Sequence, residues 1–122
     1  MLILVVDDDP EDLSLLCEGI SMVAPGSKCL MARDGVEALT LLDELMVLPD
    51  YIFLDINMPK MNGKQFLSHV KGDGHTRNVK VIMYSTTSNT KEIDECYQLG
   101  AEKFLIKPPD FTTLVKDLKG IF

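Results

Sequence analysis

Hydrophobic and polar positions alternate between two patterns along the chain. Short, nearly continuous apolar runs are each followed by a stretch in which apolar residues recur every three or four positions. Continuous runs are typical of strands that are covered on both faces of a sheet, whereas the wider spacing is typical of amphipathic helices. The pattern predicts strands at residues 2–6, 28–31, 51–54, 79–84 and 103–106.

Helical spacing of apolar residues follows each run, and most of the expected helices have a recognisable start. Aspartate or asparagine precedes four of them, which is typical of an N-cap whose side chain accepts a hydrogen bond from the first turn. Two of these caps also have a glutamate at capping-box spacing, Asp34 with Glu37 and Asn89 with Glu92. The helical positions run through 13–20, 39–46, 66–70, 93–97 and 111–118; the starts are Asp9 before Pro10, Asp34, Asn89 and Asp110, and the stops are Gly72 and Gly100.

Five strand–helix repeats predict a doubly wound, five-stranded parallel α/β sheet with five helices and right-handed crossovers. The runs at 28–31 and 103–106 are shorter or more mixed than the others, which favours positions near the sheet edges. The sequence alone leaves the strand order open. Among the common orders we adopt 2-1-3-4-5, the flavodoxin-like one, because it puts the first and third strands side by side with a ligand crevice at their carboxyl ends.

Size and charge narrow the class of protein. The 122 residues suffice for one domain, and contents of 46% hydrophobic and 25% charged residues are typical of an ordered soluble chain. A net charge of −7 opposes nonspecific attraction to nucleic acid or to anionic membranes. The opening apolar run has no basic flank and stops at Asp7, too early for a signal peptide or a spanning helix. We therefore expect a cytoplasmic protein that binds neither nucleic acid nor membrane directly.

The thiol and imidazole side chains do not form a metal motif in the sequence. Three cysteines lie far apart along the chain, and the two histidines are six residues apart with no partner at ligand spacing. The cysteines are interpreted as free, mostly buried thiols.

Carboxylates gather where the first and third strands end. Asp7, Asp8 and Asp9 follow the first strand, and Asp55 follows the third. Under the adopted strand order they converge, and such a pocket must raise a pKa or bind a cation. Oxygen ligands without thiolate or imidazole select a hard ion, and Mg²⁺ fits best. Asp9 is expected to cap a helix, and Asp7 and Asp8 taken alone are as compatible with capping a helix and solvating a loop as with holding a metal ion.

Asp55 decides between these interpretations because a charge at the end of a buried strand is costly unless it has a function. The loop after it, residues 57–63, is rich in turn residues that would let a backbone carbonyl face the metal. The fourth strand ends in Ser85 and Thr86, and the fifth ends in Lys107 before Pro108. A hydroxyl can donate to a phosphoryl oxygen, and an ammonium can neutralise its charge. The first and third strands thus end in carboxylates, the fourth in hydroxyls and the fifth in an amine, all expected at the same edge of the sheet.

With these residues in place, the sequence resembles the receiver domain of two-component response regulators over essentially its whole length. The resemblance rests on residues at receiver-like spacings: Asp7-Asp8, Asp55-Ile-Asn-Met-Pro59, Asn62-Gly63, Ser85, Gly100-Ala101 and Lys107-Pro108. It implies phosphorylation of Asp55. It also implies metal ligation by Asp8, Asp55 and the Asn57 carbonyl, with Asp7 assisting. Ser85, Thr86 and Lys107 would contact the phosphoryl group.

The resemblance carries further expectations about switching and partners. Ser85 and Phe104 match the switch positions, although Phe104 stands where tyrosine is commoner, and Thr86 is larger than the usual alanine or glycine. The Lys107–Pro108 peptide bond is expected to be cis, and the effect of Pro109 is open. The protein would be a phosphoacceptor rather than an enzyme acting on separate substrates, although it would assist its own phosphorylation and dephosphorylation.

The chain is also similar to the small stand-alone regulators of the chemotaxis type. That likeness implies a single receiver domain over residues 1–122 with no output domain, as a monomer or weak dimer. The implied partners are a histidine kinase or phosphotransfer protein and a separate output protein.

Three alternatives use similar features. A haloacid-dehalogenase-type phosphatase also has a nucleophilic aspartate and Mg²⁺, but its acid two residues later would here be Asn57, which cannot protonate a leaving group. An FMN module would need phosphate donors after the first strand, where Asp7, Asp8 and Asp9 would repel phosphate. A degenerate receiver would lack an acceptor, a metal carboxylate or the lysine, and none is missing here.

Overall fold

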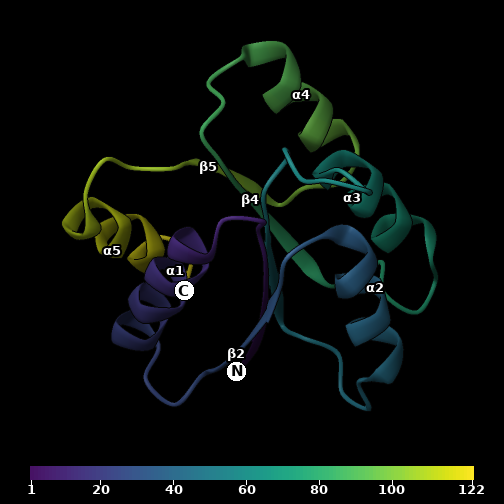
Figure 1. Ribbon diagram of the computed structural model, residues 1–122, viewed down its shortest axis with the longest axis horizontal. Coiled ribbons are helices and arrows are strands. Elements are labelled where there is room, and N and C mark those ends of the chain that lie inside the picture. The colour runs from purple at the N-terminus through teal and green to yellow at the C-terminus, as the bar shows by residue number, and fades with distance from the viewer.

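Five parallel strands form one sheet in the order β2-β1-β3-β4-β5 in the computed structural model, which describes residues 1–122 (Figure 1). The predicted order and edge positions are confirmed. Every predicted strand is present, with bounds shifted by one residue at most. The strands are β1 (Leu2–Val6), β2 (Lys28–Ala32), β3 (Tyr51–Leu54), β4 (Lys80–Ser85) and β5 (Lys103–Ile106).

Strand register brings the carboxyl ends of the central strands to one level. Val6 pairs with Leu54, and Leu54 pairs with Met83. Backbone hydrogen bonds continue just past the strands: the Asp55 amide donates to the Val6 carbonyl at 3.0 Å, and the Lys107 amide donates to the Ser85 carbonyl at 2.8 Å. The residues that follow these strands therefore share one edge of the sheet.

Helices cover both faces of the sheet. In Figure 1, α1 and α5 lie together on one side and α2 and α3 lie on the other, while α4 packs beside β5. None of them is long and apolar enough to cross a membrane. The helices are α1 (Pro10–Val23), α2 (Gly35–Glu44), α3 (Gly63–Gly72), α4 (Thr90–Gln98) and α5 (Phe111–Lys119).

Two apolar cores result, one on each face. Ile3, Val5 and Phe53 point to the α1–α5 side, whereas Leu4 and Leu54 point to the α2–α3 side, and all five are almost fully buried. This alternation explains why β1 and β3 are continuous apolar runs, since both faces of each strand need an apolar side chain.

The predicted N-caps are confirmed, but the capping boxes differ. Asp34 and Asn89 accept from the backbone three residues on, yet the Glu92 carboxylate accepts from the Thr87 hydroxyl at 2.9 Å rather than from the cap. The complete box is at the start of α3, where Asn62 and Gln65 exchange both bonds.

The end of α2 also differs from the sequence pattern, which ran to Met46. The helix ends at Glu44, Leu45 has extended backbone angles, and Met46 is fully exposed. The apolar spacing therefore continues past the helix, and Met46 does not join the buried stripe that Ala38 and Leu42 form.

Candidate functional site

Three carboxylates meet at the edge where β1 and β3 end. Oxygen atoms of Asp7, Asp8 and Asp55 all lie within 4.8 Å of one another. Asp7 and Asp55 are buried and Asp8 is exposed, so the cluster opens to solvent on one side. An open, all-oxygen site suits a hard divalent cation that keeps part of its water shell.

Asp7 is the most constrained of the three. Its carboxylate accepts from the Asp9 amide at 3.0 Å and from the Lys107 ammonium at 2.7 Å. Burial nevertheless raises the pKa of Asp7 to about 6, because it outweighs these two bonds, and the nearby charge of Asp55 adds to the rise. A raised pKa is what crowded carboxylates in a buried pocket predict.

Lys107 lies among the carboxylates. Its Nζ is 2.7 Å from Asp7, 2.8 Å from Asp12 and 3.3 Å from Asp55. Burial alone would lower the pKa of this ammonium, but the bonds to Asp12 and Asp7 and the charge of Asp55 hold the pKa well above its usual value. The lysine is therefore a permanent positive charge in the pocket.

The predicted cis bond before Pro108 is wrong: the chain has no cis peptide bond. The trans isomer of such a bond is favoured by about 0.5–1 kcal/mol. Lys107 reaches all three carboxylates from the trans backbone, so the fold does not need the other isomer to direct it.

Asp12 was missed in the sequence. It lies in the first turn of α1, 95 residues before Lys107, and its carboxylate is partly exposed. A usable signal existed, because Asp12 is one helical turn before the buried Leu16 and so lies on the row of α1 that packs inward. A charge on that row needs a partner.

The backbone around Asp55 is held tightly. Its Oδ1 accepts from the Ile56 amide at 2.8 Å, and the Gly63 amide donates to the Ile56 carbonyl at 2.8 Å. A Cβ on Gly63 would collide with the Asp55 carbonyl oxygen, so only glycine lets α3 begin this close to the acceptor loop. Asn57 is exposed within that loop.

Ser85 has a feature that no other buried side chain shares. It is completely buried, and its hydroxyl has no hydrogen-bond partner. Continuing the β3–β4 register puts Ser85 one residue beyond the level of Asp55. A buried hydroxyl without a partner is costly, which points to a partner that arrives from outside the chain. Thr86, next in sequence, is exposed.

Phe104 and α4 are linked to this edge by polar contacts. Phe104 is half-buried, and its amide donates to the Tyr97 hydroxyl at 3.0 Å. At the other end of α4, Thr87 donates to Glu92, and Lys64 of α3 bonds Glu95 at 2.8 Å. The segment after Ser85 is thus tied directly to α4.

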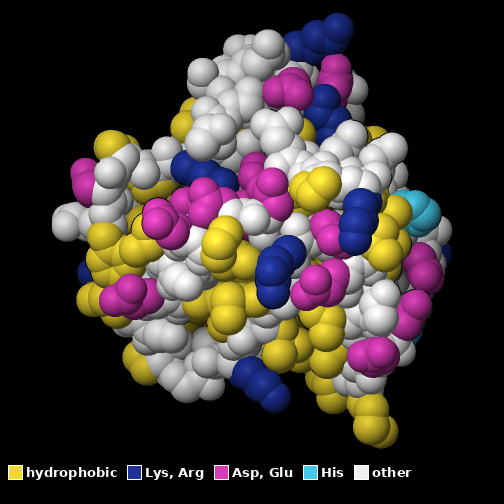
Figure 2. Space-filling model, in the orientation of Figure 1, with side chains coloured by type: hydrophobic (Ala, Val, Ile, Leu, Met, Phe, Trp, Pro, Cys, Tyr) yellow, Lys and Arg dark blue, Asp and Glu magenta, His cyan; other side chains and the backbone are white.

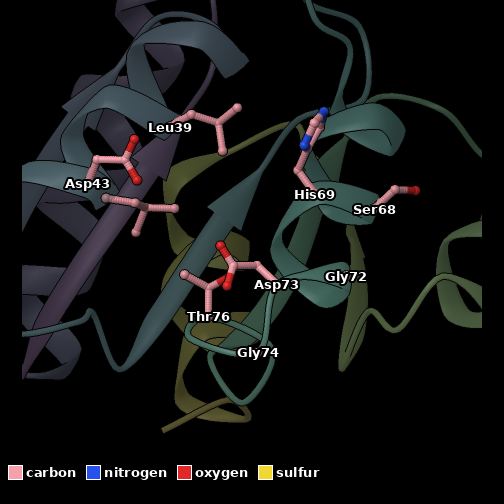
Figure 3. Close-up of a pocket in the computed structure, with 9 residues that line it drawn as sticks. Leu39, Asp43, Ser68, His69, Gly72, Asp73, Gly74 and Thr76 are labelled. Atoms are coloured by element: carbon pink, nitrogen blue, oxygen red, sulfur yellow. The ribbon is translucent and has the colours of Figure 1, made fainter.

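A separate hollow lies away from the strand ends. A cavity of about 570 Å³ opens between α2 and α3. Figure 3 shows polar side chains around it, among them Asp43, His69 and Asp73, and none of the predicted site residues lines it. Acidic side chains gather instead near the middle of the face shown in Figure 2, with a basic side chain beside them. The chemistry-bearing residues are therefore at the strand ends and not in the hollow between α2 and α3.

Comparisons with known proteins agree with this geometry. The family model of the response regulator receiver domain matches residues 3–119. The Regulator of RpoS from Escherichia coli K12 is 40% identical over 119 residues, which cover 98% of this chain and 32% of that protein. This chain therefore spans about a third of the length of that relative.

Solved structures are similar over nearly the whole chain. The phosphorylated cyanobacterial phytochrome response regulator RcpA has a TM-score of 0.90 at 29% identity, covering 98% of this chain and 89% of that one. The Mn²⁺-bound form of the response regulator Rcp1 has a TM-score of 0.87 at 26% identity, covering 98% and 90%. The family match, the parallel sheet and the strand-end residues lead to one identification: the chain belongs to the response regulator receiver domain family of two-component systems.

Proposed function

We propose that this chain accepts a phosphoryl group on Asp55 from a phosphohistidine of a histidine kinase or phosphotransfer protein, and that the phosphorylated form signals by binding a separate output protein. The observation that carries the proposal is the Ser85 hydroxyl, buried without a partner one strand away from Asp55. An oxygen of a phosphoryl group on Asp55 would accept its hydrogen bond and remove the cost of that unsatisfied donor.

The residues divide the chemistry among them. An Asp55 carboxylate oxygen forms the new bond to phosphorus, the P–N bond of the phosphohistidine breaks, and its electron pair stays on the imidazole. Lys107 neutralises the phosphoryl charge, and the 3.3 Å between its Nζ and Asp55 Oδ2 supports this role. Ser85 and the exposed Thr86 supply donors from the neighbouring strand end.

A divalent cation, Mg²⁺ in the cell, fits the acidic cluster. Asp8, Asp55 and the Asn57 carbonyl would hold it, with Asp7 assisting, and the all-oxygen ligand set and the 4.8 Å spread support this assignment. The Mn²⁺-bound form of Rcp1 is a further support. When bound, such an ion compensates the charge that gathers on the phosphoryl oxygens.

The surface that the output protein recognises would be formed by α4 and β5. If Ser85 moves toward a phosphoryl oxygen, the segment that follows it moves too, and Thr87 transmits this to Glu92 on α4. Phe104, whose backbone amide donates to the Tyr97 hydroxyl of α4, can then change rotamer into the space that Ser85 leaves. Phenylalanine has no hydroxyl to hold either rotamer by a hydrogen bond, so the phosphorylated and unphosphorylated states are only weakly distinguished.

The acidic net charge of −7 favours a protein partner over nucleic acid. The cytoplasm is the compartment we propose.

Intact mass spectrometry tests the acceptor directly. Incubation with Mg²⁺ and a small phosphodonor should add one phosphoryl group to the chain and none to Asp55→Asn. The matched control is Asp43→Asn, the same change at an exposed aspartate of α2, which should label normally. Labelling of Asp55→Asn to the wild-type extent would refute the assignment. Phosphotransfer profiling with purified histidine kinases of the same cell would then identify the donor.

A further inference from the structure

We propose that Asp12 is a positioning residue that holds Lys107 back from the acceptor and so slows phosphoryl uptake by Asp55. This inference rests on the proposed function, because it concerns the rate of that same reaction. Asp12 has no part in the acidic cluster that would hold a cation, since that cluster consists of Asp7, Asp8 and Asp55.

The distances around Lys107 are unequal. The contacts with Asp7 and Asp12, at 2.7 and 2.8 Å, have the length of strong charge-assisted hydrogen bonds. The contact with Asp55, at 3.3 Å, is longer than such bonds normally are. The ammonium has three donor hydrogens, and its two short bonds lie on the side of β1 and α1. The contact that phosphoryl transfer needs is therefore the weakest of the three.

Asp12 is fixed in place by the start of α1. The Asp9 side chain caps the helix by accepting from the amides of Glu11 and Asp12, and the Leu13 amide donates to the Asp9 carbonyl at 3.0 Å. Leu13 and Leu16 are buried and set the rotation of the helix. The Asp12 carboxylate is thus presented to Lys107 at a fixed position, and the lysine must move if their bond is to break.

There is room for the lysine on the Asp12 side. A small hollow of about 160 Å³ separates α1 from the segment that leads into α5, and Asp12, Tyr84 and Lys107 line it. The Lys107 ammonium also lies 5.5 Å from the centre of the Tyr84 ring, close enough for a favourable cation–π contact. These contacts stabilise the lysine in the position where it bonds Asp12.

Two effects of Asp12 act in the same direction. To donate to a phosphoryl oxygen on Asp55, the Lys107 ammonium must weaken one of its short bonds, and the bond to Asp12 is the one outside the cation cluster. The Asp12 charge also repels an anionic phosphodonor that approaches the partly exposed edge of the pocket. Removing that charge should therefore speed the reaction.

The test compares initial rates of phosphorylation by acetyl phosphate with saturating Mg²⁺. Asp12→Asn should be at least about threefold faster than wild type, in the range that a partly exposed ion pair is worth. The matched control is Glu11→Gln, which removes the same charge from the neighbouring exposed residue of the same turn and should stay within about twofold of wild type. An Asp12→Asn rate equal to or below wild type, or an equal gain in Glu11→Gln, would overturn the inference.

A second pair of variants tests whether Asp12 acts through the lysine. In a Lys107→Met background, Asp12→Asn should change the rate no more than Glu11→Gln does. Beryllofluoride, a non-covalent phosphoryl mimic, gives the same comparison without turnover: Asp12→Asn should tighten its binding more than Glu11→Gln does, and this excess should appear only when Lys107 is present. An excess over Glu11→Gln that persists without Lys107 would overturn the positioning role. If wild type fails to label at all, the proposed function falls with it, whereas labelling that is indifferent to Asp12 removes this inference alone.

Discussion

Asp7 should make the metal-free protein lose stability as the pH rises through the acid range. The residue is 2% exposed, and its pKa is raised to about 6 from an ordinary 3.8, chiefly by burial. Asp7→Asn removes the titration while keeping a side chain of the same shape. The quantity of interest is the difference in unfolding free energy between wild type and this variant, followed across pH.

The sign follows from proton binding. Between pH 3.8 and 6 the native Asp7 keeps its proton while the unfolded chain has released it, so the native state binds more protons and stability falls as the pH rises. Below pH 3.8 Asp7 is protonated in both the native and the unfolded state, so it causes no loss of stability. Above pH 6 Asp7 is ionised in both states, and the loss of unfolding free energy has reached its full size. A pKa difference of one corresponds to about 1.4 kcal/mol, so the rise of the Asp7 pKa amounts to about 3 kcal/mol in total.

Urea denaturation in the presence of a chelator, at intervals from pH 3.5 to 7.5, measures this difference. Wild type should lose about 3 kcal/mol relative to Asp7→Asn over that range. Any constant offset, such as a poorer contact between the introduced side-chain amide and Lys107, cancels in the comparison. Asp43→Asn, at an exposed site, is the control and should run parallel to wild type. A wild-type curve that also runs parallel to Asp7→Asn would refute the claim that burial governs this carboxylate.

Three further substitutions test other parts of the site. Asp8→Ala should weaken Mg²⁺ binding at least about tenfold while the protein stays folded, as calorimetry would show; a sharp fall in melting temperature with unchanged affinity would indicate a capping role instead. Phe104→Ala should leave phosphorylation of Asp55 near normal and blunt the dependence of partner binding on it, and an unchanged dependence would exclude the switch role. Gly63→Ala should lower the free energy of unfolding by about 2–3 kcal/mol or more in urea titrations, because its Cβ meets the Asp55 carbonyl oxygen; a neutral effect would mean that the α3 start can shift freely.

The architecture was predictable because each element has a local signal that agrees with its tertiary position. Strands that are covered on both faces must be apolar throughout, and β1 and β3 are. The caps at Asp9 and Asp110 act within one turn, so neighbouring residues suffice to recognise them. The end of α2 was predicted wrongly because its apolar spacing does not agree with where the helix stops. Met46 continues the helical spacing, yet α2 ends at Glu44 and Leu45 has extended backbone angles, so the apolar spacing outlasts the helix.

Within the site, sequence reasoning found the residues that follow strands and missed those that reach the pocket from a helix. Asp7 and Asp55 could be brought together because the carboxyl ends of adjacent parallel strands share an edge. Asp12 joins the pocket through the packing of α1 against β1 and α5; its spacing from Leu16 puts it on the inward row of α1, but the local pattern does not name Lys107 as its partner.

The cysteines show the same limit. All three cysteines are free, as expected, but only Cys96 is fully buried; Cys17 and Cys29, far apart in sequence, are half-buried and pack against the same core.

The charges around Lys107 explain why acceptance of a phosphoryl group would need more than a nucleophile. Four carboxylates, Asp7, Asp8, Asp12 and Asp55, face one ammonium, which leaves about three negative charges in a partly buried pocket at neutral pH. A phosphoryl group on Asp55 replaces one charge by nearly two. If Asp55 is phosphorylated as proposed, Lys107, already shared among three acceptors, cannot offset this increase alone, and the proposed divalent cation would compensate the rest. Asp8 and Asp12 would then have opposite effects on the charge of the phosphorylated pocket. Loss of Asp8 would weaken the compensation by the cation, whereas loss of Asp12 would remove a charge that competes for the lysine and would cost the cation no ligand.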